Sequence, residues 1–192
     1  SSTSFTAQCY RLYGSPPLGA LVRAGDAYAV VAHIVTEGVD PGRPATPRGE
    51  AEATEEDVYR SNPQLEKLLA TRFQALIVGH PDPVGTPLHY LPALPPRIHA
   101  FVYPCASDEV ARFTERLEFL HLLMESDLPG ADEAIAACLR LASACHPDGR
   151  AFLVRAGKAL AGELAGQLPR LNAILRRLAP GSDPRLRGGG LA

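Results

Sequence analysis

The residues that could hold a metal ion or act as a nucleophile are scattered along the chain. Zinc sites usually show close ligand pairs such as CxxC, HxxxH or HExxH, and the sequence contains none of these spacings. His89 and His99 could converge from neighbouring strands, although hydrogen-bonded or exposed histidines are the commoner outcome. Cys145 precedes His146 on the apolar side of a predicted helix, which argues against an activated thiol. We therefore expect no metal site and no catalytic residue.

Motifs for nucleotide binding and for serine hydrolysis are also missing. The chain has only two lysines, Lys67 and Lys158, and neither completes a GxxxxGKS or GxxxxGKT phosphate loop. No GxGxxG and no GxSxG stretch occurs, so the dinucleotide fingerprint and the nucleophile elbow are excluded as well. The sequence predicts no cofactor.

Two arginines in a long Gly- and Pro-rich loop are the first candidates for binding. Residues 36–56 show neither a strand period nor a helix period, and loops of this length are usually functional or disordered. Arg43 and Arg48 lie in this loop, where exposed guanidinium groups could bind an anion or a carboxylate of a partner. The alternative is a loop kept soluble by charge, which is also how we interpret the acidic run at residues 50–57.

A second group of candidates follows the Pro-Pro pair at 95–96. Arg97 and His99 are predicted to contact a partner or an anion beside this extended entry. A competing hypothesis is a pocket at the mouth of the strand-rich half. Its lining would be Tyr59, Tyr90, His99 and Tyr103. Such a pocket would suit a small ligand or a reaction if two titratable groups came within hydrogen-bond reach of each other.

Strands in the first half of the chain must position these residues. Phe73, Ala75 and Ile77 alternate with their neighbours, and Gly25 with Asp26 indicates a tight turn. A short helix is predicted at 63–70. The expected strands cover residues 6–13, 18–22, 27–35, 71–79, 87–91 and 98–103. Short strands with many Gly and Pro residues suit a small closed or nearly closed antiparallel β-barrel, because closure removes exposed edges.

After Pro104 the apolar spacing becomes helical. Ser107 is a good N-cap, and Asp108 and Glu109 follow in the positively polarised first turn. The predicted helices cover residues 107–125, 131–145, 150–166 and 168–179, which form a bundle of three or four helices. The expected fold class is therefore α+β. A β-barrel domain spans 1–104 with the loop 36–56, a helical domain spans 105–180, and a disordered tail spans 181–192.

The charge is unevenly distributed along the chain. The net charge is −2, but residues 150–192 carry eight basic and two acidic groups, and the other 149 residues carry 11 basic and 19 acidic groups. The basic end could pack on the acidic body, join other subunits or touch nucleic acid. Residues 153–192 contain no aromatic side chain on which a base could stack, so nucleic-acid binding is not favoured.

The compartment is expected to be the cytoplasm. No apolar run approaches the roughly 18–20 residues of a membrane span, and the first residues do not resemble a secretory signal. The four cysteines, Cys9, Cys105, Cys138 and Cys145, form no disulfide framework and are interpreted as reduced thiols.

Parts of the β half resemble the HAS-barrel, the small N-terminal β-barrel of HerA-type translocases and F1 ATP synthase subunits. The resemblance covers about residues 4–104. It rests on the stretches PLGALV at 17–22, YAVV at 28–31, TRFQALIVG at 71–79 and LPPRIH at 94–99. It implies a stand-alone barrel that oligomerises and docks partners, without the ATPase domain that carries catalysis in that family. No catalytic residue is transferred by it.

The sequence therefore favours a non-enzymatic adaptor or assembly module that binds a protein partner or itself. The alternative is a small-molecule-binding protein or an enzyme with a pocket at the barrel mouth. A nucleic-acid-binding accessory protein, acting through the basic C-terminal helix, is the third and weakest hypothesis.

Overall fold

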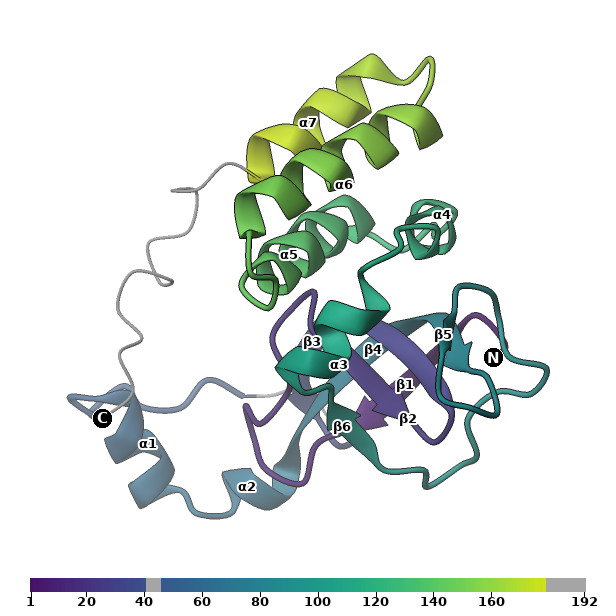
Figure 1. Cartoon of the computed structure of the whole chain (residues 1–192). Helices are drawn as coiled ribbons and strands as arrows, with labels where there is room; N and C mark the ends of the chain where they lie inside the picture. The colour runs from purple at the N-terminus through teal and green to yellow at the C-terminus, as the bar shows by residue number, and fades with distance from the viewer. Residues whose placement is uncertain (41–45, 179–192) are drawn as a thin grey trace.

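A computed structural model describes residues 1–40 and 46–178 as a mixed α+β fold, with one antiparallel sheet and a layer of helices (Figure 1). The sheet has six strands, in the order β1-β4-β3-β2-β6, and β5 pairs with β4. Their bounds are β1 Ser4–Gln8, β2 Leu21–Ala24, β3 Ala27–Gly38, β4 Leu69–Pro81, β5 Pro87–Leu88 and β6 Val102–Pro104. Every strand pair is antiparallel.

The long strands β3 and β4 form the centre of the sheet. Both carry nearly continuous runs of buried residues, as expected for strands covered on two faces. Gly25, at φ 59°, lies in the turn that joins β2 to β3. A register shift between Val31 and His33 marks a bulge, beyond which His33 is exposed.

Helices cover one face of this sheet. They are α3 Ser107–Phe113, α4 Phe119–Met124, α5 Ala131–Ser143, α6 Gly149–Glu163 and α7 Leu168–Leu178. One core cluster joins strand residues such as Val30 and Val78 to Phe113, Phe119 and Leu139 of the helices. Burying a large apolar side chain fully contributes about 1.5–3 kcal/mol, so this shared cluster holds the helical layer on the sheet.

The other face of the sheet is also buried, although no helix of the described residues lies on it. A second core cluster contains Val22, Val31, Phe73 and Ile77, with Phe5 of β1 packed against it. Two more apolar side chains, Leu91 and Val102, come from the chain that leads into β6 and pack on the same cluster. This chain, and not a helix, therefore covers the second face.

The expected closed or nearly closed barrel is not confirmed, because the sheet is open with β1 and β6 at its two edges. The reason lies in the prolines at 81, 83, 87, 92, 95, 96 and 104, which lack the N–H that a strand ladder needs. The predicted strands 87–91 and 98–103 accordingly shrink to two residues of β5 and three of β6. Strands this short leave no ladder between β6 and β1.

The helical half differs from a self-contained bundle of three or four helices. Five helices follow β6 in the described part of the chain, and α4 and α5 pack directly on β4 and β3. The expected single helix 107–125 is interrupted between Phe113 and Phe119. The hydroxyl of Thr114 donates to the carbonyl oxygen of Val110 at 2.7 Å and contacts Nε2 of His146 at 2.8 Å, which anchors the end of α3.

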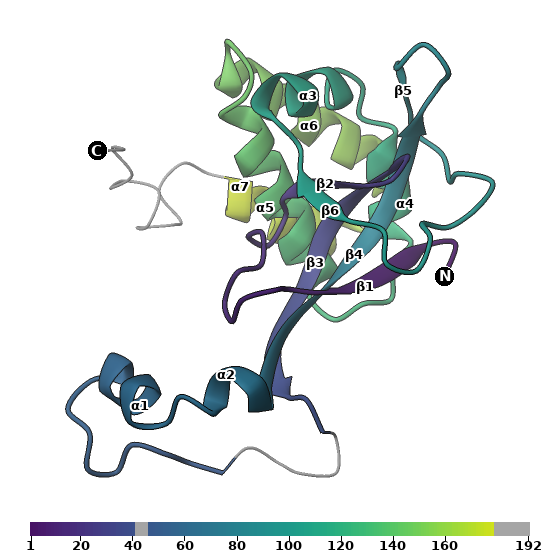
Figure 2. The ribbon, with the colours of Figure 1, turned by 90° about the horizontal axis from the view of Figure 1, so that it is seen from below.

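A helical arm, defined here as residues 46–68, projects from the far end of the β3–β4 hairpin (Figure 2). It holds α1 Glu55–Ser61 and α2 Leu65–Leu68, neither of which has a buried residue. The expected loop 36–56 thus overlaps β3 and α1, and the expected helix 63–70 is shorter, since Leu69 already belongs to β4. The proposed tail at 181–192 lies outside the described residues. A domain boundary near residue 104 stays a prediction.

Within the described ranges, no helix has the length and apolar character needed to cross a membrane.

Candidate functional site

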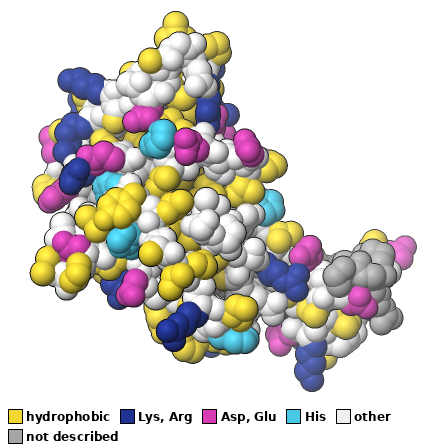
Figure 3. All heavy atoms as spheres, turned by 90° about the vertical axis from the view of Figure 1, so that its right-hand side faces the viewer, with side chains coloured by type: hydrophobic (Ala, Val, Ile, Leu, Met, Phe, Trp, Pro, Cys, Tyr) yellow, Lys and Arg dark blue, Asp and Glu magenta, His cyan; other side chains and the backbone are white. Residues whose placement is uncertain are grey.

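Within the described residues, the exposed large apolar side chains are concentrated in the segment that runs from the β5 turn into β6. We call residues 84–103 the apolar segment. It contributes six of the twelve exposed large hydrophobic side chains found in the described part of the chain. These are Val84 (87% exposed), Tyr90, Leu94 (79%), Ile98 (88%), Phe101 and Tyr103. Hydrophobic side chains gather over the middle and lower part of the body in Figure 3. Single exposed apolar residues are common, but half of those in the described part of the chain come from this one segment.

The prolines explain why these side chains stay outside. Proline fixes φ and lacks a backbone N–H, so this part of the chain forms neither a helix nor a long strand. It therefore has no regular apolar face that could be buried as a unit. A tight turn lies near the C-terminal end of the apolar segment, where the N–H of Ala100 donates to the carbonyl oxygen of Arg97 at 3.0 Å. Within it His99 has φ 65°, a left-handed conformation in which His is several-fold enriched over most side chains. The turn leaves Ile98 in solvent.

A groove of about 310 Å³ lies at the beginning of the apolar segment. It runs between the β5 turn and the end of α3. Its lining is Val84, Gly85, Thr86, Pro87, His89, Arg112, Phe113, Glu115 and Arg116. The turn is held in shape by Asp82, whose carboxylate accepts the N–H groups of Val84 (2.9 Å) and Thr86 (2.7 Å). These hydrogen bonds lower the pKa of Asp82, so the turn stays intact at neutral pH.

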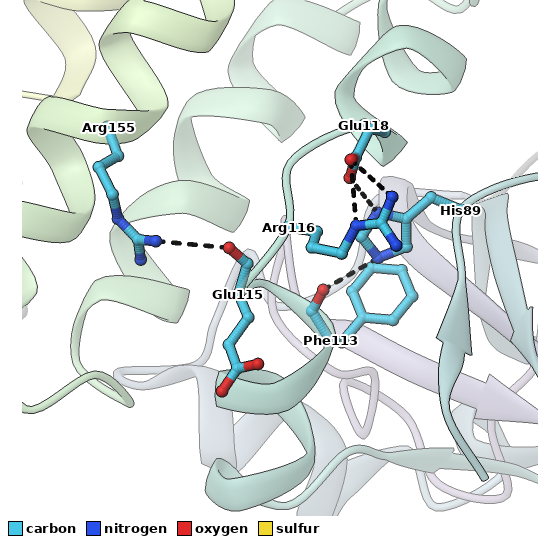
Figure 4. A network of polar contacts seen from close by, with 6 residues as sticks. All are labelled: His89, Phe113, Glu115, Arg116, Glu118 and Arg155. Atoms are coloured by element: carbon cyan, nitrogen blue, oxygen red, sulfur yellow. Dashed lines mark hydrogen bonds and ion pairs between the residues drawn. The ribbon is translucent and has the colours of Figure 1, made fainter. Parts of the chain in front are cut away.

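His89 links the apolar segment to the helical layer. Its Nε2 lies 3.0 Å from the carbonyl oxygen of Phe113, and its Nδ1 lies 3.1 Å from Oε2 of Glu118 (Figure 4). The ring also packs on Phe113 and Phe119, with centroid distances of 4.6 and 5.4 Å. Burial lowers the pKa of His89, and the neighbouring Glu118 carboxylate opposes that shift. A neutral ring can donate only one of these two hydrogen bonds, whereas a protonated ring donates both.

The charges around His89 are largely paired with each other. Arg116 donates from Nε and Nη2 to Oε1 of Glu118 at 3.1 and 2.9 Å. Arg112 lies 3.9 Å from Asp108, one turn back along α3. The carboxylate of Glu115 points away from His89, and its backbone oxygen accepts from Nη1 of Arg155 at 3.4 Å (Figure 4). The groove is therefore a mixed-charge surface, without a concentrated positive field for an anion.

This geometry suits binding better than proton transfer. A general base must reach the substrate with a free nitrogen, but both nitrogens of His89 already face protein oxygens. The side chain of His89 is only 6% exposed. We interpret His89 as a link that fixes the apolar segment against α3 and α4.

The residues expected around a pocket do not line this groove. Tyr59 lies on α1 in the arm, away from β5 in both ribbon views, and its hydroxyl lies 2.5 Å from that of Tyr13 (Figures 1 and 2). The hydrogen bond with Tyr13 raises the pKa of Tyr59 to about 12. Tyr90 packs edge-on against His80 at 5.0 Å, and Tyr103 lies beside Phe101. Of the expected lining, Tyr90, His99 and Tyr103 share the apolar segment.

The arginine candidates fall in three places. Arg43 lies outside the described residues. Arg48 is exposed in the arm, where Nη1 donates to Oδ1 of Asn62 at 3.4 Å. Arg97 is exposed in the turn of the apolar segment, next to Ile98 and His99. The structure thus brings Arg97 and His99 together and leaves Arg48 in the separate arm.

Sequence reasoning missed the apolar residues themselves. Ile98 and Phe101 were expected inside the strand 98–103, and Val84 and Leu94 lie between the expected strands, so none of the four was predicted as a contact residue. The usable signal was a set of large apolar residues that alternate with prolines and so cannot be buried by regular pairing.

The basic helix α7 is tied to the helical layer. Arg170 donates from Nε to Oδ1 of Asp132 at 3.0 Å, and Arg177 pairs with Glu133, both carboxylates lying in the first turn of α5. Arg170 and Arg177 are therefore only partly exposed, whereas Arg176 is exposed.

No group of three or more His, Cys, Asp or Glu side chains in the described residues could hold a metal ion. No family model matches this chain, and no curated protein or solved structure matches it at a significant level. The site must be interpreted from its own chemistry.

Proposed function

We propose that this protein is a non-enzymatic assembly module that binds a protein partner through the apolar segment. The observation that carries the proposal is the concentration of exposed large apolar side chains in residues 84–103. Protein interfaces are built on buried aromatic and aliphatic anchors surrounded by polar groups. Here Leu94, Ile98 and Phe101 supply anchors, and Arg97 and His99 supply polar groups beside them.

The link at His89 supports this proposal. A binding surface gains affinity when it is already ordered before the partner arrives, because less conformational entropy is lost on association. His89 and the Asp82 turn fix the first part of the apolar segment to α3 and β4. Its other end is fixed by β6, where Tyr103 pairs with Arg23 of β2. The exposed anchors therefore lie between two fixed points.

A double substitution tests the proposal. Leu94→Ser with Ile98→Ser removes two exposed anchors and should leave the core intact, because neither side chain belongs to a core cluster. We expect affinity capture from the source cells, with quantitative mass spectrometry, to show at least about a tenfold loss of a specific partner, since anchors of this kind dominate binding. Leu168→Ser, at the start of α7, changes another exposed leucine (65%) outside the apolar segment, and this matched control should retain the partner. Equal capture by all three proteins would exclude the apolar segment as the binding surface.

The relationship to the HAS-barrel remains part of this proposal. In its favour, β1, β3, β4 and β6 surround one apolar cluster, as the strands of a small barrel would. The open edge between β1 and β6 is a departure from that family. An experimental structure with β1 and β6 paired, free or in a complex, would support the relationship, and a sheet that remains open would count against it.

We place this function in the cytoplasm, as the four free cysteines suggest. Fractionation of the source cells tests this placement. A nucleic-acid role through α7 gains no support, because Arg170 and Arg177 already pair with carboxylates of α5.

A further inference from the structure

Strand β1 leaves half of its backbone groups facing away from the sheet. The N–H of Ile77 donates to the carbonyl oxygen of Thr3, and that of Cys9 to the carbonyl oxygen of Thr71, each at 2.8 Å. In an antiparallel ladder, residues alternate between bonding inward and bonding outward. The odd-numbered residues of β1 therefore bond to β4, and the backbone groups of Ser4, Thr6 and Gln8 point to the open edge.

These outward groups are free for another strand. In the part of the chain that the structure describes, Thr6 and Gln8 have no backbone partner on that side, and both residues are exposed. The N–H of Ser4 has only a local bond of 3.3 Å to Oγ of Ser1. Figure 2 shows β1 beside β4 as the last strand of the sheet. Unpaired edges of this kind are templates for pairing.

The other edges are protected against pairing, and β1 is not. Strand β6 ends at Pro104, which has no N–H, and β5 pairs through Pro81 and Pro87. Soluble proteins protect their edges with prolines, bulges or charged side chains. Residues 1–10, by contrast, contain no proline and no Asp, Glu, Lys or Arg. This difference between the edges favours pairing of β1 with a further strand.

We propose that two copies of this chain dimerise by antiparallel pairing of their β1 strands about Thr6. Two identical strands can pair about a twofold axis, which places Thr6 opposite Thr6 and Ser4 opposite Gln8 of the second copy. All of these pairs use the outward groups. The same register places Phe5 opposite Ala7 of the second copy, a large side chain against a small one, on the face of the second core cluster. A neutral strand has no like charges to oppose this self-pairing.

The interface is separate from the apolar segment, so the proposal does not depend on the proposed function. It extends the sheet across the dimer and continues the half-buried row of Phe5 and Ala7 over the twofold axis. Dimerisation would display two apolar segments on one particle, and a bivalent surface binds a multivalent partner more tightly than one copy does.

Register-specific cross-linking tests the pairing. In a Cys9→Ser background, Thr6→Cys places the two new thiols directly opposite each other, and a short bifunctional thiol reagent should yield a covalent dimer. Gln8→Cys alone should not, since its two copies would lie about 14 Å apart along the strands, at four residues of 3.4 Å each. A mixture of the Ser4→Cys and Gln8→Cys chains should cross-link. Equal yields from Thr6→Cys and Gln8→Cys would overturn the proposed register.

A proline substitution tests whether this edge supports the dimer. Thr6→Pro removes an outward N–H from each copy without breaking a bond to β4. We expect the dimer dissociation constant, measured by sedimentation equilibrium, to rise about tenfold or more. Circular-dichroism melting of the same variant should show a folded chain. The Leu94→Ser, Ile98→Ser protein should dimerise like the wild type, which separates this inference from the proposed function. A monomeric wild type, or an unweakened Thr6→Pro dimer, would overturn the proposal.

Discussion

Gly19 and Gly25 both have positive φ, at 82° and 59°, but their surroundings differ. A Cβ on Gly19 would overlap the backbone of Ala137 and Cys138 in α5, whereas a Cβ on Gly25 would meet nothing within 4 Å. We expect Gly25→Ala to cost about 1 kcal/mol, from left-handed strain alone. Gly19→Ala should cost about 3 kcal/mol or more, since overpacking adds to that strain. Urea unfolding of both variants measures the difference, and equal losses would show that the loop before β2 does not press on α5.

Acid should destabilise the protein through two histidines. Burial lowers the pKa of both His89 and His146. The unfolded chain then takes up a proton at a pH where the folded chain does not. The contribution of the two neutral imidazoles to the free energy of unfolding is therefore complete above about pH 6.5 and is lost as the pH falls below that value. The urea midpoint of unfolding should fall as the pH is lowered from 7.5 to 5, an interval that includes the ordinary His pKa.

The control for this pH effect is the double variant His89→Gln, His146→Gln. Its urea midpoint should fall less steeply over the same interval than that of the wild type, although its stability at pH 7.5 is lower. A parallel fall of the two proteins would show that carboxylates, and not these imidazoles, cause the acid sensitivity.

At the scale of elements, the contact of Glu109 with Tyr28 fastens α3 to the sheet. The Tyr28 hydroxyl donates to Oε1 of Glu109 at 3.1 Å, and Tyr28 is almost fully buried. Arg23 also contacts that oxygen at 3.2 Å, but its side chain is about half exposed (49%), so this ion pair should contribute little. Glu109→Ala should cost about 1–2 kcal/mol because it leaves the buried hydroxyl without its acceptor.

A double-mutant cycle measures this contact. Tyr28→Phe with Glu109→Ala should cost less than the sum of the two single changes, since the unsatisfied hydroxyl is removed with its partner. Arg23→Ala is the matched comparison and should change the unfolding free energy by less than about 0.5 kcal/mol. Strict additivity of the first pair would contradict the assigned role.

The elements differ in how far the sequence determines them. Helices α5 to α7 begin and end within a few residues of their predicted bounds, because an apolar stripe and local punctuation act together; Gly130 precedes α5, and Asp148 caps α6 by accepting the N–H of Ala151 at 2.8 Å. The break between α3 and α4 could not be predicted, since residues 114–118 contain neither Gly nor Pro. At the break Thr114 contacts His146, which is 32 residues away along the chain, and no local pattern predicts such a contact.

For the candidate site, the sequence predicted two exposed residues of the apolar segment but not the groove or the hydrogen bonds of His89. Arg97 and His99 were expected at a surface, and both are exposed. The groove and the partners of His89 depend on α3 and α4 meeting the β5 turn, and no local pattern encodes this approach. Gly79 leaves room for β5 and α3, because a Cβ there would overlap the carbonyl oxygen of Leu88 and would lie 3.3 Å from the ring of Phe113.

At the scale of the whole molecule, stability should be unevenly distributed. The two core clusters lie in the sheet and the helices α3–α7, while α1 and α2 bury no residue. Isolated helices of seven and four residues are marginal in water. Hydrogen exchange should therefore be fast in α1 and α2 and slow in α5. Protection of α1 comparable to that of α5 would show that something unseen covers the arm.

The order of β then α was predictable, because the period changes from two to 3.6 after Pro104. The open architecture was not. A buried cluster on the second face is compatible with either a closed barrel or a sheet covered by its own connecting chain, and only the lengths of β5 and β6 decide between them.

The helical arm is a suitable place to insert a label. Since residues 50–53 are far from both clusters along the hairpin and contribute nothing to either of them, a fluorescent tag inserted there should leave folding undisturbed. Such a tag would sit on a stalk built by β3 and β4, and energy transfer from it could follow the encounter of two molecules in living cells.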